Sequence, residues 1–308
     1  MAKDVLSILN LKDNLEILID NAMTMKTVDP SQKKQVKKLP LSGKNVVLLF
    51  EKPSLRTKAS FAVAVHLLGG QTVYMGAEEV QIGKRESVSD IGKVLSRYFD
   101  AIVYRAFSHK TMVELAEAAS IPVINALDDL EHPCQAVGDL LTIREKKGGL
   151  RGLKLAYVGD GNNVCNSLLL GCALVGTNIS VASPSNYKPK ADIVSEAEKI
   201  GSKTGDKIDV GTNPLKAFEN AYIVYTDVWI SMGQEAEKEA RETAFLPYQI
   251  TEKVMSKAKQ DAIFMHCMPA HRGTEVSSDV IDGPKSVVMD QAENRLHAQK
   301  ALLIFSLG

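Results

Sequence analysis

The sequence has few cysteines and none of the patterns that make cysteine structural. Its 308 residues include four cysteines, none of which forms a C-x-x-C pair, and four are too few for a disulfide framework. Cys165 and Cys172 fall seven residues apart on one predicted helix, which would place them roughly 10 Å apart, too far to bridge. We therefore expect a reducing compartment, the cytoplasm.

The sequence also lacks an excess of charge of either sign. Lysine plus arginine total 37, and aspartate plus glutamate also total 37, so the net charge is zero. This balance argues against nucleic-acid binding driven by global charge, because no surplus of cations exists to displace counterions. A local basic pocket stays possible, and the basic run at 33–38 is expected to be a solvated helix face.

Long apolar runs and targeting signals are missing as well. No apolar run approaches the roughly 18 residues of a membrane span. The first residues contain neither the apolar stretch of a signal peptide nor an arginine-rich transit sequence. The sequence therefore predicts no membrane partner and no nucleic-acid partner.

Short apolar segments alternate with helical patterns along the chain, which predicts an α/β fold. A length of 308 residues predicts two domains at about 150 residues each. Alternating strands and helices indicate doubly wound domains with parallel sheets. The expected boundary lies at Gly148-Gly149, which gives domains at 1–148 and 149–290, with a last helix at 291–308 packing back onto the first. Strands are expected at 46–50, 101–104, 121–124, 153–158, 179–182, 222–225 and 262–265.

Polar residues that follow a strand deserve particular weight, because ligands in such folds bind beyond the carboxyl ends of the strands. The segment Ser54-Leu55-Arg56-Thr57 follows the first predicted strand and begins a helix. Free N–H groups at a helix start and an arginine both suit a phosphate, although an ordinary serine cap with an exposed arginine explains the same residues. Arg105 follows the next strand, and two cations at neighbouring strand ends favour an anion site.

The segment His132-Pro133-Cys134-Gln135 suits an amide or carbamoyl group. Histidine can donate to a carbonyl oxygen, and glutamine can both donate and accept. A capping histidine followed by a glutamine in the first helical turn is the alternative interpretation.

The segment Gly159-Asp160-Gly161-Asn162-Asn163 begins like a dinucleotide fingerprint but does not complete it. Val164 stands where the third glycine belongs, and Ala182-Ser183-Pro184 after the next strand offers no acid for a ribose. We therefore do not expect NAD. The glycines still allow close approach of the backbone to a ligand, and the side chains of Asn162 and Asn163 offer amide donors for a carboxylate.

Further along the chain, Asp227 and Ser231-Met232-Gly233 suit an amino acid. Asp227 could pair with an ammonium group, and the Ser231 hydroxyl with the Met232 and Gly233 backbone could bind a carboxylate. The acidic stretch 235–242 is expected to be a solvated helix face.

Two more candidates come late in the chain. His266-Cys267-Met268-Pro269 follows a strand, although a buried cysteine is usually a small hydrophobe. Arg295 begins the last helix, where an arginine is normally an exposed ion-pair partner. Only His266 and His271 have a spacing that suits a metal, and no local carboxylate or cysteine cluster completes a site. We expect neither a metal nor a cofactor.

Taken together, these motifs resemble the carbamoyltransferases, and most closely the ornithine carbamoyltransferases. The four segments that carry the resemblance occur in the family's order and spacing across the whole chain. They are Ser54-Leu55-Arg56-Thr57, His132-Pro133-Cys134-Gln135, Asp227 with Ser231-Met232-Gly233, and His266-Cys267-Met268-Pro269.

The resemblance implies a carbamoyl phosphate domain, an ornithine domain, and an active site in the cleft between them. It also implies a homotrimer or a multiple of trimers with shared active sites. The implied carbamoyl phosphate contacts are Ser54, Leu55, Arg56, Thr57, Gln81, Arg105, His132, Gln135, Cys267, Met268 and Arg295, with Gln81 reaching a neighbouring subunit. The implied ornithine contacts are Asn163, Asp227, Ser231 and Met232. The implied catalytic residues are Arg105, His132, Asp227, Cys267 and Arg295.

The sequence departs from the family at two positions of the phosphate motif and one of the cysteine motif. The family usually reads S-T-R-T-R, where this chain has Leu55 and Lys58. Leu55 can still donate its backbone N–H, whereas Lys58 keeps the charge but loses the bidentate fork. Met268 replaces a leucine, a volume-conserving change at a backbone contact.

Three alternatives to this interpretation fit the residues to different degrees. Another amine could be the acceptor: aspartate, putrescine or an acylated ornithine. A non-catalytic regulatory paralogue would be expected to lack Arg56, Arg105 or His132, and all three are present. A dehydrogenase is excluded because the dinucleotide motif lacks its third glycine and no acid follows the next strand to bind a ribose.

Overall fold

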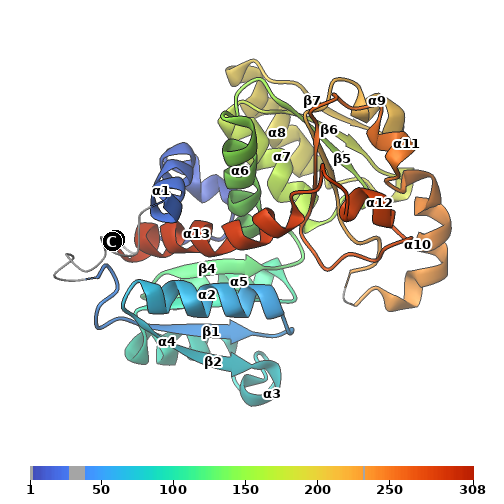
Figure 1. The fold of residues 1–308 in the computed structure, drawn as a ribbon. Coiled ribbons are helices and arrows are strands. Elements are labelled where there is room, and N and C mark those ends of the chain that lie inside the picture. Colours follow the sequence, from blue (N-terminus) through green and yellow to red (C-terminus); the bar gives the residue numbers. More distant parts are fainter. Residues whose placement is uncertain (1–2, 28–38, 232) are drawn as a thin grey trace. The chain divides into compact units, whose positions relative to one another are not determined.

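The protein is described by a computed structural model that covers residues 3–27, 39–231 and 233–308. The basic run at 33–38 and Met232 lie outside the described residues. The chain divides into unit 1, Met1–Leu141 with Glu293–Gly308, and unit 2, Thr142–Ala292 (Figure 1). The division lies inside helix α6 (Pro133–Lys147), ahead of the Gly148-Gly149 pair, because this helix continues unbroken up to the glycines.

Unit 1 contains a parallel sheet of four strands in the order β2-β1-β3-β4. The strands are β1 (Asn45–Phe50), β2 (Gln71–Gly76), β3 (Ala101–Arg105) and β4 (Val123–Leu127). Strands β1 and β3 are almost wholly buried, which explains their continuous apolar runs. Strand β2 was not predicted from the sequence; it is an edge strand with alternating, partly exposed residues.

Helices cover both faces of this sheet. Helix α2 (Leu55–Leu67) lies on one face, and α4 (Val88–Tyr98) and α5 (His109–Ala118) lie on the other (Figure 1). The second face is closed by a core in which Ile91 and Leu115 pack against strand residues such as Val47 and Ile102. The unit also contains α1 (Leu15–Thr27), the short α3 (Ala77–Val80), a 3-10 turn at Ile8–Leu11, and most of α13 (Val288–Leu307).

Unit 2 contains a parallel sheet of five strands in the order β7-β6-β5-β8-β9. The strands are β5 (Lys154–Val158), β6 (Asn178–Ala182), β7 (Ile208–Gly211), β8 (Ile223–Thr226) and β9 (Ile263–His266). Helices α7 (Asn163–Val175) and α8 (Ala191–Thr204) pack together beside β6 and β7. The core of the other face receives side chains from α9 (Pro214–Phe218), α10 (Lys238–Phe245), α11 (Glu252–Met255) and α12 (Ser278–Ile281).

These two units confirm the predicted class, α/β with two doubly wound parallel sheets. In each sheet the chain reverses its direction of winding once, between β1 and β3 in unit 1 and between β5 and β8 in unit 2. Crevices at such points, outside the carboxyl ends of the strands, are where ligands bind in open α/β sheets. Among the described residues, no helix combines the length and apolar content that crossing a membrane requires.

Candidate active site

The start of α2 lies directly beyond β1 in unit 1. The Ser54 hydroxyl accepts a hydrogen bond of 3.3 Å from the backbone N–H of Thr57. Ser54 therefore caps the helix, as the alternative to a phosphate site predicted. The helix start also leaves N–H groups available to an anion, and Leu55 is 80% exposed there. Lys58, where the family usually has arginine, makes a cation–π contact. Its ammonium lies 3.4 Å from the centre of the Tyr74 ring on β2.

Arg105 is the last residue of β3 and is paired in register with Phe50, the last residue of β1. It is 6% exposed, so the strand end buries a cation beside the start of α2. Lys52, in the loop after β1, lies near enough for Arg105 to affect it: burial and then the charge of Arg105 lower the pKa of Lys52. Both cations therefore belong to one positive region of unit 1.

Arg295 connects the far end of the chain to this region. It is 2% exposed, although an arginine at the start of the last helix is normally an exposed ion-pair partner. Its guanidinium donates to the Thr57 hydroxyl at 3.2 Å and to the side-chain oxygen of Gln135. Gln135 in turn donates to Asp139 at 2.8 Å. Gly138 makes this approach possible, because a Cβ there would lie 3.0 Å from Cδ of Arg295.

His132 is buried near these cations. Burial, followed by the charges of Arg295, Arg105, Lys52 and Arg56, lowers its pKa well below the ordinary value. A neutral imidazole surrounded by four cations can donate a hydrogen bond to a carbonyl oxygen while the cations bind a dianion. We call this set the unit 1 site; it consists of Lys52, Ser54, Arg56, Thr57, Arg105, His132, Gln135 and Arg295.

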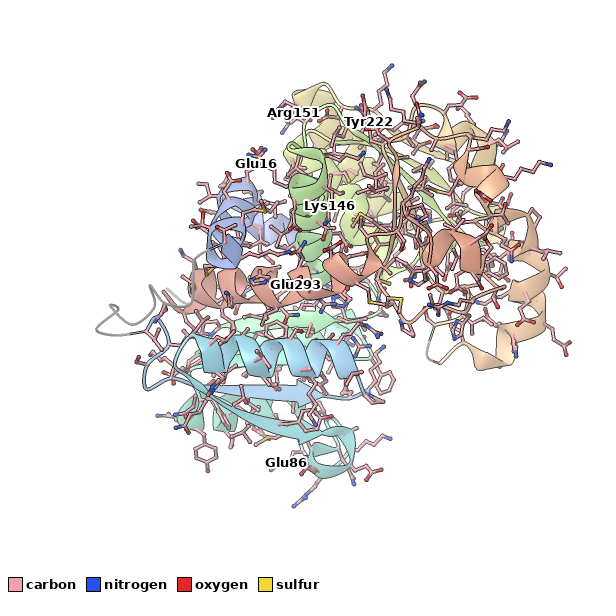
Figure 2. All side chains as sticks on the ribbon, in the orientation of Figure 1. Glu16, Glu86, Lys146, Arg151, Tyr222 and Glu293 are labelled. Atoms are coloured by element: carbon pink, nitrogen blue, oxygen red, sulfur yellow. The ribbon has the colours of Figure 1, made fainter. Side chains whose placement is uncertain are left out.

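Gln81 does not share a strand end with the unit 1 site. It follows α3, beyond the edge strand β2, and adopts a left-handed conformation with φ 48°. Its side chain is exposed and donates to the carbonyl of Glu78 at 3.4 Å. Glu86, labelled in Figure 2, closes the same loop by accepting from Gly83 at 3.0 Å.

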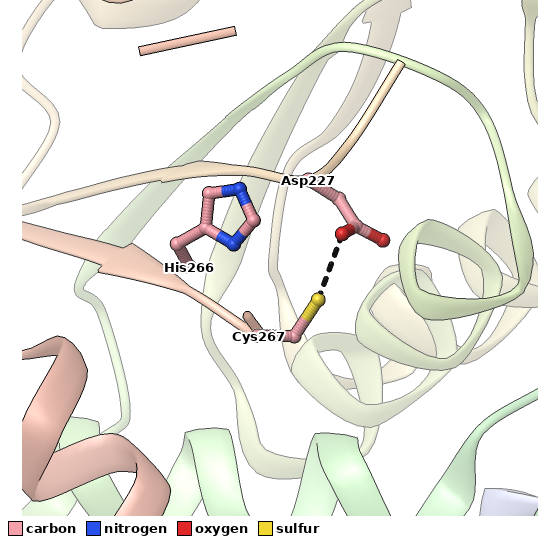
Figure 3. A group of neighbouring side chains, drawn as sticks. All are labelled: Asp227, His266 and Cys267. Carbon is pink, nitrogen blue, oxygen red and sulfur yellow. Dashed lines mark hydrogen bonds between the residues drawn. The ribbon is translucent and has the colours of Figure 1, made fainter. Parts of the chain in front are cut away.

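In unit 2, Asp227 follows β8 and receives hydrogen bonds from two other strand ends. The Asn162 amide, in the loop after β5, donates to Oδ2 of Asp227 at 2.7 Å, and the Cys267 thiol after β9 donates to Oδ1 at 2.8 Å (Figure 3). Asn162 also caps α7 by accepting from Val164 and Cys165. Both asparagines were predicted to offer amide donors, and the amide that reaches Asp227 is that of Asn162. Asn163, the one predicted to contact ornithine, is the first residue of α7.

The segment after β9 is fixed by the buried His266. Its Nδ1 accepts the backbone N–H of Met268 at 2.9 Å, so the ring proton is on Nε2, which lies 3.3 Å from the buried carboxylate of Glu275. Asp227, His266 and Cys267 each offer a metal-ligating atom, and these atoms lie within 4.8 Å of one another. The sequence analysis found no such cluster. Because both nitrogens of His266 already have partners, the group fits a hydrogen-bonded network better than a vacant ligand set.

Arg241 corrects the prediction that the stretch 235–242 is wholly a solvated helix face. Glu237 and Glu239 are exposed, but Arg241 is 5% exposed. Its Nη1 donates to Oδ2 of Asp160 and to the carbonyl of Trp229, both at 3.0 Å, and its Nε donates to Glu237 at 2.9 Å. Burial raises the pKa of Asp160 to about 6 despite this ion pair.

Arg241 therefore connects the loop after β5, which carries Asn162, to the loop after β8, which carries Asp227 and Ser231. The Ser231 backbone N–H donates to the side-chain oxygen of Gln234 at 3.0 Å. We call the second set the unit 2 site; it consists of Asn162, Asn163, Asp227, Ser231, His266, Cys267 and Met268. The ion pair of Asp160 and Arg241 was not predicted from the sequence. In the sequence these are two opposite charges 81 residues apart, and no local pattern connects them.

A hollow of about 940 Å³ in unit 2 lies elsewhere. It is lined by residues at the amino ends of the strands, among them Lys154, Asn178 and Tyr222, which is labelled in Figure 2. None of the predicted site residues lines it, and parallel sheets bind ligands at the opposite end. We therefore place the candidate site at the carboxyl ends of the strands.

Comparisons with known proteins match this chain over almost its whole length. Residues 3–145 match the family model described as aspartate/ornithine carbamoyltransferase, carbamoyl-P binding domain, and residues 151–306 match the Asp/Orn binding domain of the same family. The chain is 49% identical to "Ornithine carbamoyltransferase, catabolic" of Thermoplasma volcanium over 304 residues, 98% of either chain.

Two solved structures extend the comparison to the fold. The ornithine carbamoyltransferase of Pyrococcus furiosus superposes with a TM-score of 0.93 at 45% identity, covering 100% of this chain and 97% of the other. The anabolic enzyme of Campylobacter jejuni superposes with a TM-score of 0.89 at 37% identity, covering 98% of both chains.

Proposed function

This chain belongs to the aspartate/ornithine carbamoyltransferase family, and we propose on that premise a function for each of its two sites. The protein is a transferase that converts carbamoyl phosphate and L-ornithine into L-citrulline and phosphate. Its curated relatives of about 49% identity over the full chain carry that activity in their names. The observation that carries the proposal is that His132, Arg105 and Arg295 are buried in one unit, with Arg295 bonded to both Gln135 and Thr57.

The unit 1 site suits carbamoyl phosphate. Arg56, Arg105 and the N–H groups at the start of α2, including that of Leu55, would hold the phosphate. Thr57, Arg105 and His132 would donate to the carbonyl oxygen. Gln135 would orient the carbamoyl amide, and Arg295, already bonded to Gln135 and Thr57, would fix both groups. The backbone carbonyls of Cys267 and Met268 are proposed to accept from the same amide.

The unit 2 site suits ornithine. Asp227 would pair with an ammonium group, since its carboxylate is buried and held in place by Asn162 and Cys267. Ser231 and Met232, with Asn163, would bind the remaining polar groups of the amino acid. The δ-amine is then free to react.

The proposed chemistry is a direct acyl transfer without a covalent enzyme intermediate. The neutral δ-amine attacks the carbamoyl carbon, a C–N bond forms, and the bond from that carbon to the phosphate oxygen breaks. Negative charge on the carbonyl oxygen is met by Thr57, Arg105 and His132, which are preplaced donors. Phosphate leaves against Arg56 and Arg105 and takes up the amine proton. The protein contributes mainly position and electric field.

The amine must first lose a proton, because an ammonium has no lone pair. Asp227 and Cys267 are the ionisable groups of the unit 2 site that could affect this step. Activity should therefore rise with pH through the pKa of bound ornithine. A pH-independent rate of the chemical step would count against direct attack by the δ-amine.

The assembly proposed is a homotrimer or a multiple of trimers, in which Gln81 reaches the unit 1 site of a neighbour. Gln81 supports this idea by being exposed beyond the edge strand β2. Mixing an inactive Gln81→Ala variant with an inactive Arg105→Ala variant tests it. Shared sites predict that the mixture recovers part of the activity, whereas sites made by one chain predict no recovery.

Two further points complete the proposal. The cytoplasm is the proposed compartment, supported by four cysteines that are all free thiols. No nucleic-acid or membrane partner is proposed. The direction of the reaction in the cell is left open, since the relatives include enzymes named catabolic and anabolic.

The decisive experiment is a product assay with carbamoyl phosphate and a panel of amines. Ornithine should give citrulline, while aspartate, putrescine and acetylornithine should give little or no product. Product from another amine without product from ornithine would overturn the substrate assignment, and no product with any amine would overturn the enzymatic assignment.

A further inference from the structure

A buried carboxylate organises the loop that leads to His132. Asp128 is fully buried in unit 1, between β4 and α6. Its Oδ1 accepts the backbone N–H groups of Leu130 at 2.8 Å and Glu131 at 2.7 Å. Its Oδ2 accepts the amide of Asn125 at 2.8 Å. This pattern fixes the chain from 128 to 131, and His132 is the next residue.

The same carboxylate is connected to the strand end that carries Arg105. Nδ1 of His109, the first residue of α5, lies 2.6 Å from Oδ2 of Asp128, and the backbone N–H of His109 donates to Asp129 at 2.6 Å. His109 follows Arg105 by four residues, and Ala106 between them donates to the carbonyl of Leu127 at 2.9 Å. One ion pair thus joins the segment after β3 to the segment before His132.

The surroundings of His109 favour its charged form. The hydrogen bond to Asp128, with further attraction from Glu131 and Asp129, raises the pKa of His109 above its ordinary value, against the effect of burial. Lys52, in the loop after β1, is a cation that interacts electrostatically with both Asp128 and Asp129. Acidic groups outnumber cations around His109, so this loop stabilises the protonated imidazolium.

We propose that His109 and Asp128 are positioning residues for carbamoyl phosphate, and that the unit 1 site loses affinity for this substrate when His109 gives up its proton. The inference rests on the proposed function of the unit 1 site. Neither residue needs to touch the substrate, since Asp128 acts through the loop before His132 and His109 acts through the segment after Arg105. A neutral His109 can still donate from Nδ1, but the bond then loses its charge assistance.

The test compares His109→Gln with the parent protein across pH 6 to 9. Glutamine keeps a hydrogen-bond donor but carries no charge at any pH. The KM for carbamoyl phosphate and the Kd for inorganic phosphate are measured at each pH, so the ligand's own titration cancels in the ratio of the two proteins. The parent should bind roughly fivefold more tightly than the variant at pH 6, and the two should converge at pH 9.

Two further variants separate this role from a loss of fold. His66→Gln, an exposed histidine on α2, should keep the parental pH profile. Asp128→Asn should weaken phosphate binding over the whole pH range. The KM for ornithine should change little in His109→Gln or Asp128→Asn, because the proposed ornithine site belongs to unit 2. A merely structural role would lower the thermal midpoint and the active fraction without changing the pH profile.

Parallel pH profiles in the parent and His109→Gln, with normal citrulline formation, would overturn this inference alone. Absence of citrulline formation by the parent protein would instead overturn the proposed function.

Discussion

The Cys267 thiol donates a hydrogen bond of 2.8 Å to Oδ1 of Asp227, which joins the end of β9 to the end of β8. Asn162 donates to the other oxygen from the end of β5. Three strand ends of one sheet therefore converge on a single buried carboxylate. If that carboxylate binds ornithine, its orientation depends on both donors.

The first prediction concerns the thiol itself. Cys267→Ala removes a donor to a charged acceptor, an interaction that contributes about 1.5–3 kcal/mol. We expect kcat/KM for ornithine to fall by roughly tenfold to a hundredfold. Cys267→Ser keeps a donor and should lose less. Equal losses in both variants, measured by steady-state kinetics, would show that the hydrogen bond to Asp227 is not what Cys267 contributes.

The second prediction concerns the buried cation at the end of β3. Arg105→Ala should cost several kcal/mol of transition-state stabilisation, or roughly a hundredfold or more in rate, because the proposed mechanism places Arg105 against both the leaving phosphate and the carbonyl oxygen. Arg97→Ala, an exposed arginine on α4, is the matched control and should leave the rate unchanged. Near-normal turnover of the Arg105 variant would remove this residue from the site.

The third prediction concerns Arg241 and the loops of the unit 2 site. Arginine reaches Asp160 and the Trp229 carbonyl from Nη1 and Glu237 from Nε, whereas lysine carries all its donors on one nitrogen, so Arg241→Lys should loosen both loops. The KM for ornithine should rise about tenfold or more, while the KM for carbamoyl phosphate should change little. Arg272→Lys, in an exposed pair with Asp282, should change neither. Equal rises in both KM values would contradict a role confined to the ornithine loops.

The fourth prediction concerns the effect of pH on stability through His132. Its pKa in the folded protein lies well below the ordinary value, so below about pH 6.5 the unfolded chain binds a proton that the folded chain does not. This contribution therefore lowers stability as the pH falls, by at most about 1.4 kcal/mol per pH unit. Urea midpoints at pH 7.5 and 5.5 should drop more in the parent protein than in His132→Gln. An equal drop would refute this.

The fifth prediction concerns close backbone packing beside the unit 2 site. A Cβ on Gly161 would lie 2.1 Å from the backbone nitrogen of Pro189, so Gly161→Ala must displace the loop that carries Asp160 and Asn162. We expect a loss of about 2 kcal/mol or more in stability and weaker ornithine binding. Gly149→Ala, where nothing lies within 4 Å, is the control. A parental thermal midpoint for the Gly161 variant would show that the loop can move freely.

The sequence was most informative at the ends of buried strands. Buried parallel strands are continuous apolar runs, so Arg105 and Asp227, which follow such runs, could be assigned before the order of the strands was known. His132 was found by the same rule, after a short apolar segment that the structure shows to be β4.

Features that depend on the order of the strands or on contacts between distant segments could not be predicted in this way. Strand β2 is partly exposed at a sheet edge, so its apolar pattern is weak. Arg241 stands among exposed charges, and only its contact with Asp160 distinguishes it from a surface residue. The convergence of Asn162 and Cys267 on Asp227 requires β5, β8 and β9 to be neighbours, which no local pattern indicates.

The discontinuity of unit 1 has a consequence for biosynthesis. Arg295 completes the site that begins at Ser54, and the whole of unit 2 is encoded between them. During translation the chain emerges from its amino end, so unit 2 is made before unit 1 can be finished. A chain that ends anywhere in unit 2 lacks Arg295 and therefore lacks its contacts with Thr57 and Gln135. On the proposed function, such truncated products would be unable to consume carbamoyl phosphate.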